Sequence, residues 1–131
     1  MENDLRAALI AWLRSDPALA DINSIAEEAP LSASPPWLGI AASASIDWGT
    51  KDRAGRETRI ALELETRNDL PGADAPLLGA IERRVLDLPP FQPGFELAST
   101  RFLRSRSEAR DDNRRAALLE FRFRILEPST E

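Results

Sequence analysis

The chain has 131 residues, of which 43% are hydrophobic and 30% are charged, and its formal net charge is −5 at pH 7. These values predict one globular domain over residues 1–131 that buries a real core, and they argue against a disordered chain. The chain contains no cysteine and no histidine, which excludes disulfides, thiolate metal sites and imidazole-dependent nucleophilic triads, while the acidic balance argues against general nucleic-acid binding.

Residues 3–14 are predicted to form the first helix, because Leu5, Leu9 and Leu13 recur at helical spacing. We interpret this amphipathic segment as a helix laid on a sheet rather than as a docking face. A short edge strand is expected over 24–28. The N-terminus lacks the basic start and apolar core of a signal peptide, and no apolar run reaches the length of a membrane span, so we expect synthesis in a cytoplasm and no membrane contact.

The segment 37–48 is predicted to be a strand, and the polar residues 49–55 are predicted to form a hairpin connection to the next strand. Period-2 alternation places five residues of this strand on one face: Leu38, Ile40, Ala42, Ala44 and Ile46. The other face is lined by small residues, which would permit close approach of a neighbouring element.

The two most regular stretches of the chain are 57–67 and 116–126, where apolar and charged side chains alternate at period 2. One face of these strands is apolar and is expected to meet the core, through Thr58, Ile60, Leu62, Leu64, Leu119, Phe121, Phe123 and Ile125. The opposite face carries both acidic and basic side chains. We predict that this face and the edges of the sheet make subunit contacts, the face through Arg59, Glu63, Glu65, Arg67, Glu120, Arg122 and Arg124.

A second helix is expected over 75–88, followed by a strand over 95–104 and a polar turn over 105–113. The predicted element order is therefore α-(β)-β-β-α-β-β. This order predicts an α+β fold with a four-stranded, mainly antiparallel sheet and two helices packed on one face.

Two groups of acidic residues are candidates for chemistry. Asp111 and Asp112, followed by Asn113, have ligand-type oxygens, but such residues between strands more often form the turn itself, and we expect no metal. Glu63 and Glu65 are spaced as a carboxylate pair, although neutralisation by Arg59 and Arg67 on the same face is the favoured interpretation. A carboxylate enzyme is therefore the least favoured class, and no cofactor is expected.

Four segments together resemble a known family: LRAAL…LRSDPALADI, PLSASPPWLGI, DAPLLGAIERRVLDL and RRAALLEFRFRIL. Their pattern and order are similar to those of the tail-completion, or tail-terminator, proteins of long-tailed phages, whose relatives occur in gene transfer agents. The similarity covers essentially the whole chain, and no single motif in it is diagnostic.

The resemblance implies a structural virion protein, not an enzyme. It implies a homo-oligomer, a hexameric ring that caps the tail tube and joins it to the head-side connector or stopper protein. DNA passes transiently through the channel of such a ring, which is commonly acidic, without specific binding. The implied location is the head–tail junction of the virion tail, after assembly in the host cytoplasm.

In such a ring, we expect the 49–55 and 105–113 loops to face partner proteins or the channel, through Lys51, Asp52, Arg53, Arg106, Glu108, Arg110, Asp111 and Asp112. Reversing Glu63 and Glu65 to arginine is expected to impair ring formation while the monomer stays folded. The alternative is a small protein-binding module or tail-assembly chaperone that acts as a monomer or dimer and docks through its first helix.

Overall fold

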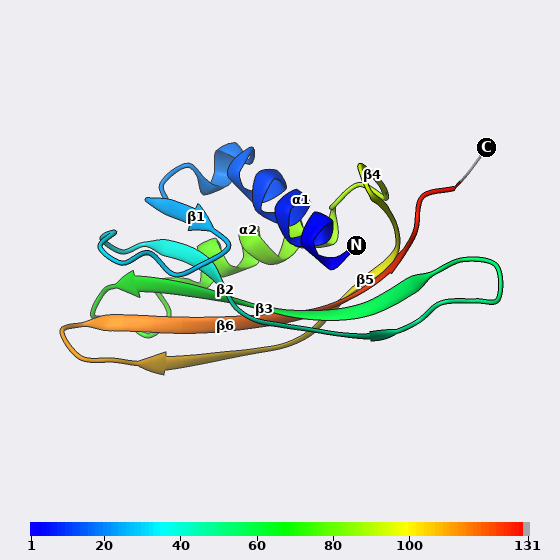
Figure 1. The fold of residues 1–131 in the computed structure, drawn as a ribbon. Helices are drawn as coiled ribbons and strands as arrows, with labels where there is room; N and C mark the ends of the chain where they lie inside the picture. Colours follow the sequence, from blue (N-terminus) through cyan, green and yellow to red (C-terminus); the bar gives the residue numbers. More distant parts are fainter. Residues whose placement is uncertain (130–131) are drawn as a thin grey trace.

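Two helices lie on one side of a long, curled sheet (Figure 1). The computed structural model describes residues 1–129. Its helical elements are α1 (Glu2–Arg14), the 3-10 turn η1 (Pro17–Leu19) and α2 (Ala75–Leu86). Its strands are β1 (Ser24–Ala26), β2 (Trp37–Asp47), β3 (Gly55–Arg67), β4 (Phe91–Gln92), β5 (Phe95–Ala109) and β6 (Arg114–Leu126). Within this described part, no helix combines the length and apolar character that a membrane span requires.

The sheet has six strands in the order β1-β2-β3-β6-β5-β4. The prediction of an α+β fold with both helices on one face is confirmed, but the prediction of four strands is wrong. The central four strands are antiparallel to their neighbours, whereas the three-residue β1 runs parallel to β2 and the two-residue β4 adds to β5. Strands this short present too few residues to show a period, so the sequence did not reveal β4.

The core lies between the helices and the middle of the sheet. β3 contributes Ile60, Leu62 and Leu64, and β6 contributes Phe121 and Phe123, all with 1% exposure or less. The buried stripe of the helices includes Leu5, Leu9, Leu13, Ile81 and Val85. Burying large aliphatic and aromatic side chains stabilises the fold by roughly 1.5–3 kcal/mol each. The face assignments predicted for β3 and β6 are therefore confirmed.

The predicted face of β2 is correct only for its first half. A β-bulge between Ile40 and Ala42 shifts the pairing with β3, so that Ile40 lies opposite Leu62 but Ala42 lies opposite Ala61. The extra residue reverses the side-chain parity. Ala42, Ala44 and Ile46 therefore share the outer face with the charged residues of β3, and not the core face with Leu38.

Two hairpins extend beyond the helices at opposite ends of the sheet (Figure 1). Gly55 lies opposite Leu126, and Arg67 lies opposite Arg114, so the 48–54 loop and the 110–113 loop lie at opposite ends of the β3–β6 pair. The predicted polar turn over 105–113 is wrong, because β5 continues to Ala109 and only 110–113 form the loop. Residues 104–109 are exposed on both faces of the sheet, so no apolar alternation marks them as a strand.

Candidate assembly surface

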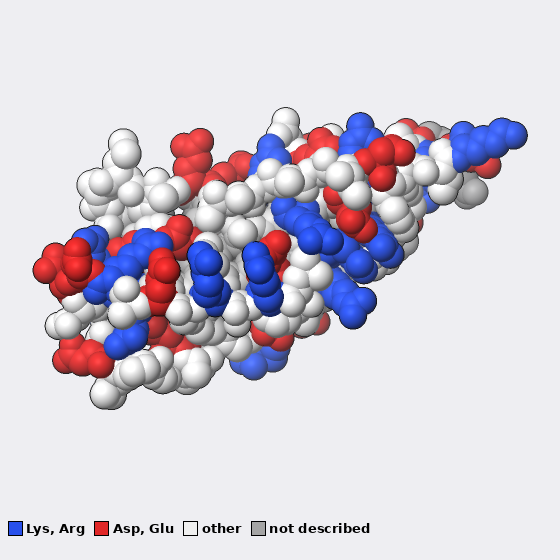
Figure 2. Space-filling view, turned by 90° about the horizontal axis from the view of Figure 1, so that it is seen from below, with Lys and Arg blue, Asp and Glu red and all other residues white. Residues whose placement is uncertain are grey.

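The sheet face turned away from the helices is rich in arginine and glutamate. Figure 2 looks at this outer face and shows basic side chains in a band that runs along it, with acidic side chains interspersed. In the middle of the band, Arg59 of β3 lies opposite Arg122 of β6, which lies opposite Arg101 of β5. Like charges directly opposite each other destabilise a sheet. The three arginines of this row therefore do not stabilise the sheet by pairing with one another.

One end of the outer face is neutralised by ion pairs within the chain. Arg110 Nη1 lies 3.0 Å from a Glu63 carboxylate oxygen and 3.7 Å from one of Glu65, and Arg114 Nη1 lies 3.4 Å from Glu65. The hydrogen bond that Arg110 donates to Glu108 is the main cause that raises the pKa of Arg110, and the charge of Glu63 raises it further, while desolvation acts in the opposite sense. Glu65 is buried, at 6% exposure. This network secures the tip of the β5–β6 hairpin to β3.

The remainder of the outer face is only partly neutralised. Glu57 accepts a hydrogen bond of 3.0 Å from Arg124 Nε and lies 4.0 Å from Arg122, whose buried Nε has no hydrogen-bond acceptor. Arg104 and Glu120 form a pair at 2.7 Å. Arg59, Arg67 and Arg101 are exposed, and no ion pair is formed by them within residues 1–129.

The structure separates the residues predicted for partner-facing loops. Lys51 and Asp52 are exposed at the tip of the 48–54 loop, whereas Arg53 turns back to Glu96 at 3.7 Å. Asp111 and Asp112 are exposed in the opposite loop, where Asp112 and Asn113 both adopt φ of 59°. Arg106 and Glu108 lie in strand β5 and not in a loop, which corrects their assignment.

The acidic residues considered for chemistry do not converge. Glu63 and Glu65 are neutralised as predicted, but by Arg110 and Arg114 and not by Arg59 and Arg67. Asp111 and Asp112 lie in a turn of the kind that such residues favour. The part of the chain that is described contains no group of three or more potential metal-binding side chains.

The ion pairs of Glu63 and Glu65 complicate the proposed charge reversal, because arginines at positions 63 and 65 would repel Arg110 and Arg114 within the same chain. A substitution of Arg59, which has no ion pair in residues 1–129, would test the outer face without this effect.

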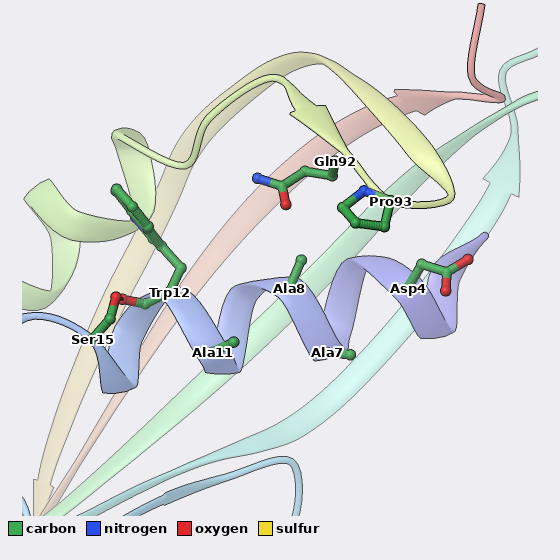
Figure 3. A pocket seen from close by; sticks show the side chains of 8 residues that line it. All are labelled: Asp4, Ala7, Ala8, Ala11, Trp12, Ser15, Gln92 and Pro93. Atoms are coloured by element: carbon green, nitrogen blue, oxygen red, sulfur yellow. The ribbon is translucent and has the colours of Figure 1, made fainter.

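The largest hollow lies on the helix side, along α1 (Figure 3). It has a volume of about 490 Å³ and is lined mainly by small and apolar groups: Asp4, Ala7, Ala8, Ala11, Trp12, Ser15, Gln92 and Pro93. Trp12 is fixed in place, because its Nε1 donates to the Arg84 carbonyl at 2.7 Å and the Arg84 guanidinium stacks 3.3 Å from its ring centre. The lining offers an apolar groove with one carboxylate, Asp4, at its end.

The sequence predicted subunit contacts at the edges of the sheet but not which strands form those edges. β1 and the residue after it cover β2 only as far as Ile40, and β4 and the residue before it cover β5 only as far as Leu97. Beyond these short pairings, each edge is without a neighbouring strand in the described chain. Residues 41–46 contain only alanine, serine and isoleucine. Such a segment indicates an unprotected edge only if its strand lies at the edge of the sheet, and the strand order was not predicted from the sequence.

Comparison with known proteins gives a family and a fold. A chain in a solved structure titled "Virion of native gene transfer agent (GTA) particle" has 18% sequence identity and a TM-score of 0.82, over 95% of this chain and 96% of that chain. At this identity the likeness shows the fold alone. No curated protein matches the sequence. The family described as "Tail completion protein gp17" matches residues 7–126. The chain therefore belongs to the tail completion protein gp17 family, and it is a structural component of the virion tail.

Proposed function

We propose that copies of this chain form a closed ring, a hexamer, that caps the tail tube and joins it to the head-side connector. DNA passes through the centre of the ring without specific binding. Membership of the tail completion family supports this role, and the likeness to a chain of a gene transfer agent virion supports the fold it requires. The observation that carries the proposal is the outer face of the sheet, which is charged and carries the row formed by Arg59, Arg122 and Arg101 across three strands.

Subunit contacts are proposed along the rim of this sheet and on its outer face. The arginine row supports this, because Arg59 and Arg101 have no ion-pair partner in residues 1–129 and a neighbouring copy could supply one. Charged contacts of this kind fix register and exclude wrong partners more than they add affinity. The hairpin loops, which lie at opposite ends of the sheet, are proposed to contact the tail tube on one side and the connector on the other.

The experiment is to locate the protein in particles and to measure its mass there. Particles from cells that make an affinity-tagged chain are imaged with a label against the tag, and detached ring assemblies are analysed by sedimentation. A label at the head–tail junction and a mass near six chains are expected. A label elsewhere, or no label in the particle, would reject the proposal. A mass near three or twelve chains would reject only the hexamer.

The groove along α1 favours a second function. A small protein-binding module or assembly chaperone would dock a partner segment between α1 and the Gln92–Pro93 turn. Ala8→Trp would fill this groove without touching the outer face of the sheet. Under the chaperone reading, this variant lowers the yield of tails while the protein is absent from finished particles. Under the ring reading, the protein stays in the particle.

A further inference from the structure

The two long edges of the sheet lie on opposite sides of one chain and face outward. On one side, β2 is open beyond Ile40, and on the other side β5 is open beyond Leu97. The sheet register places Ile46 level with Glu57, Arg124 and Ser99, so the two open edges occupy the same level of the sheet. A chain with two free edges of this kind can accept a neighbour on each side.

Hydrogen bonds at the two hairpins show which backbone groups face outward. The Trp48 N–H donates to the Gly55 carbonyl at 3.1 Å, so by the alternation of an antiparallel ladder Ser43 and Ser45 direct their N–H and C=O groups away from β3. The Arg110 N–H donates to the Arg114 carbonyl at 2.7 Å, so Ser105 and Ser107 likewise face away from β6. At both edges the outward-facing residues are exposed serines, which leave room for another strand.

The β2 edge lacks the usual protection against pairing. Natural edge strands are commonly shielded by charged residues or proline, because their free N–H and C=O groups are a template for another chain. No charged residue and no proline occurs between Ala41 and Ile46. The neighbouring hollow on the outer face is lined by Ala44, Ile46, Glu57 and Arg59, and its two apolar residues offer a floor for the side chains of a partner.

The β5 edge is complementary to the β2 edge and not to itself. Its outer-face side chains include Arg104 and Arg106, so two β5 edges paired together would bring arginines against arginines. Beside β2, the same arginines would lie across Ala44 and Ile46, with their aliphatic stems on the apolar floor. Pairing of β2 with β2 is free of charge repulsion, but it would stop at two copies.

Strand direction also fits a head-to-tail arrangement. Each of the four central strands is antiparallel to the next, so β2 and β5 run in opposite directions. A copy related by rotation about a ring axis would therefore present β5 antiparallel to β2. Tilt of the strands to that axis shifts the pairing along β2, which is what brings residues 105–107 of one copy beside residues 43–45 of the next, because within one chain the two segments lie at different levels of the sheet. Contacts between two different surfaces of identical chains generate rings when the rotation closes.

We propose that β2 of each copy pairs, antiparallel, with β5 of the next copy, so that one continuous sheet runs around the ring. Ser43 and Ser45 on one side and Ser105 and Ser107 on the other form the centre of the contact. Arginines of β5 occupy the hollow of Ala44, Ile46, Glu57 and Arg59 on the neighbouring copy. The inference rests on the proposed ring and names the surfaces that close it.

Disulfide cross-linking tests the contact, because the natural chain has no cysteine. Four double variants combine Ser43→Cys or Ser45→Cys with Ser105→Cys or Ser107→Cys, to sample the register. Opposed residues in an antiparallel pair have Cα atoms about 4.5–5.5 Å apart, within the range that a disulfide spans. Within one chain the two positions are three strand spacings apart, about 14 Å, so they cannot join to each other. The single variants are the matched controls.

Particles are prepared with each double variant and oxidised. At least one of the four variants is expected to give a ladder of linked chains on a denaturing gel, up to the number of chains in the ring, and reduction should return the ladder to monomer. The single variants give monomer. Linked dimers from a single β2 variant would overturn the inference in favour of a symmetric β2 contact. Particles that contain the ring but give no ladder with any double variant would also overturn it, while the proposed function stands. Particles that lack the protein would instead reject the ring itself.

Discussion

The middle of the sheet and its rim are built from the same strands but differ in what holds them. In the middle, the helix-facing side chains of β3 and β6, such as Ile60 and Phe121, are fully buried beneath the helices. At the rim, the second half of β2 and residues 104–109 of β5 are exposed on both faces. The middle is therefore stabilised within one chain, whereas the rim is stabilised mainly by backbone pairing. The difference predicts that stability and assembly can be disrupted separately.

The largest effect on stability is expected in the middle. Phe121→Ala removes a fully buried ring that packs edge-on against Phe102 at 5.6 Å, and it is expected to cost about 3–5 kcal/mol of unfolding free energy. Ile46→Ala at the rim, where the side chain is 63% exposed, is expected to cost under about 0.5 kcal/mol. Urea unfolding of both variants measures the contrast. Equal losses would mean that the rim is packed in solution.

A pair of proline variants separates the two sides of β2. Ala44 lies opposite Arg59 and directs its N–H toward β3, so Ala44→Pro breaks a ladder hydrogen bond and is expected to cost about 2 kcal/mol. Ser43 directs its N–H outward, so Ser43→Pro is expected to cost under about 1 kcal/mol while abolishing incorporation into tails. Thermal unfolding and particle composition are the two measurements. A Ser43→Pro chain that enters tails normally would show that the β2 edge is not a contact.

The turn between β4 and β5 holds β4 against the first residues of β5, so only the remainder of the β5 edge is open. Gly94 has φ of 88°, and a Cβ there would lie 2.5 Å from an Asp4 carboxylate oxygen of α1. Gly94→Ala is therefore expected to cost about 1 kcal/mol and to loosen β4 from β5. Hydrogen exchange should show faster exchange at the Leu97 N–H, which donates to the Pro90 carbonyl at 2.7 Å. Unchanged exchange would mean that β4 holds without this turn.

The sequence predicts the middle of the molecule well because burial forces a period on the residues there. The alternation in 57–67 and 116–126 exists because one face meets the helices, and both strands were predicted with the correct faces. The same reasoning misplaced Ala42 and Ala44, since one bulged residue reverses parity and no residue type marks the bulge. It missed 105–109 of β5, because a strand exposed on both faces has no hydrophobic period.

The sequence predicted which charged residues lie on the outer face, but not which of them form ion pairs with one another. Charged residues at alternating positions of β3 and β6 lie where the pattern placed them. Which of them neutralise one another depends on contacts between residues far apart in the chain, such as Arg110 with Glu63, 47 positions away. The arginine row likewise appears only when three strands are set in register. Open edges follow from strand order in the same way.

The smallest effect is expected for the ion pairs that secure the rim. Arg110 is exposed, so Arg110→Ala is expected to cost about 0.5 kcal/mol or less after solvent screening, and high salt should remove most of that loss. Because the pKa of Arg110 is raised in the folded chain, its contribution, which requires charged carboxylates at Glu63 and Glu108, is fully present below the ordinary arginine pKa and is lost as the pH rises through the raised pKa. Arg67→Ala, at an exposed arginine without an ion pair in residues 1–129, is the matched control. Urea unfolding at low and high salt measures both variants. A loss for Arg110→Ala that survives high salt would mean that its side chain holds the hairpin by packing rather than by charge.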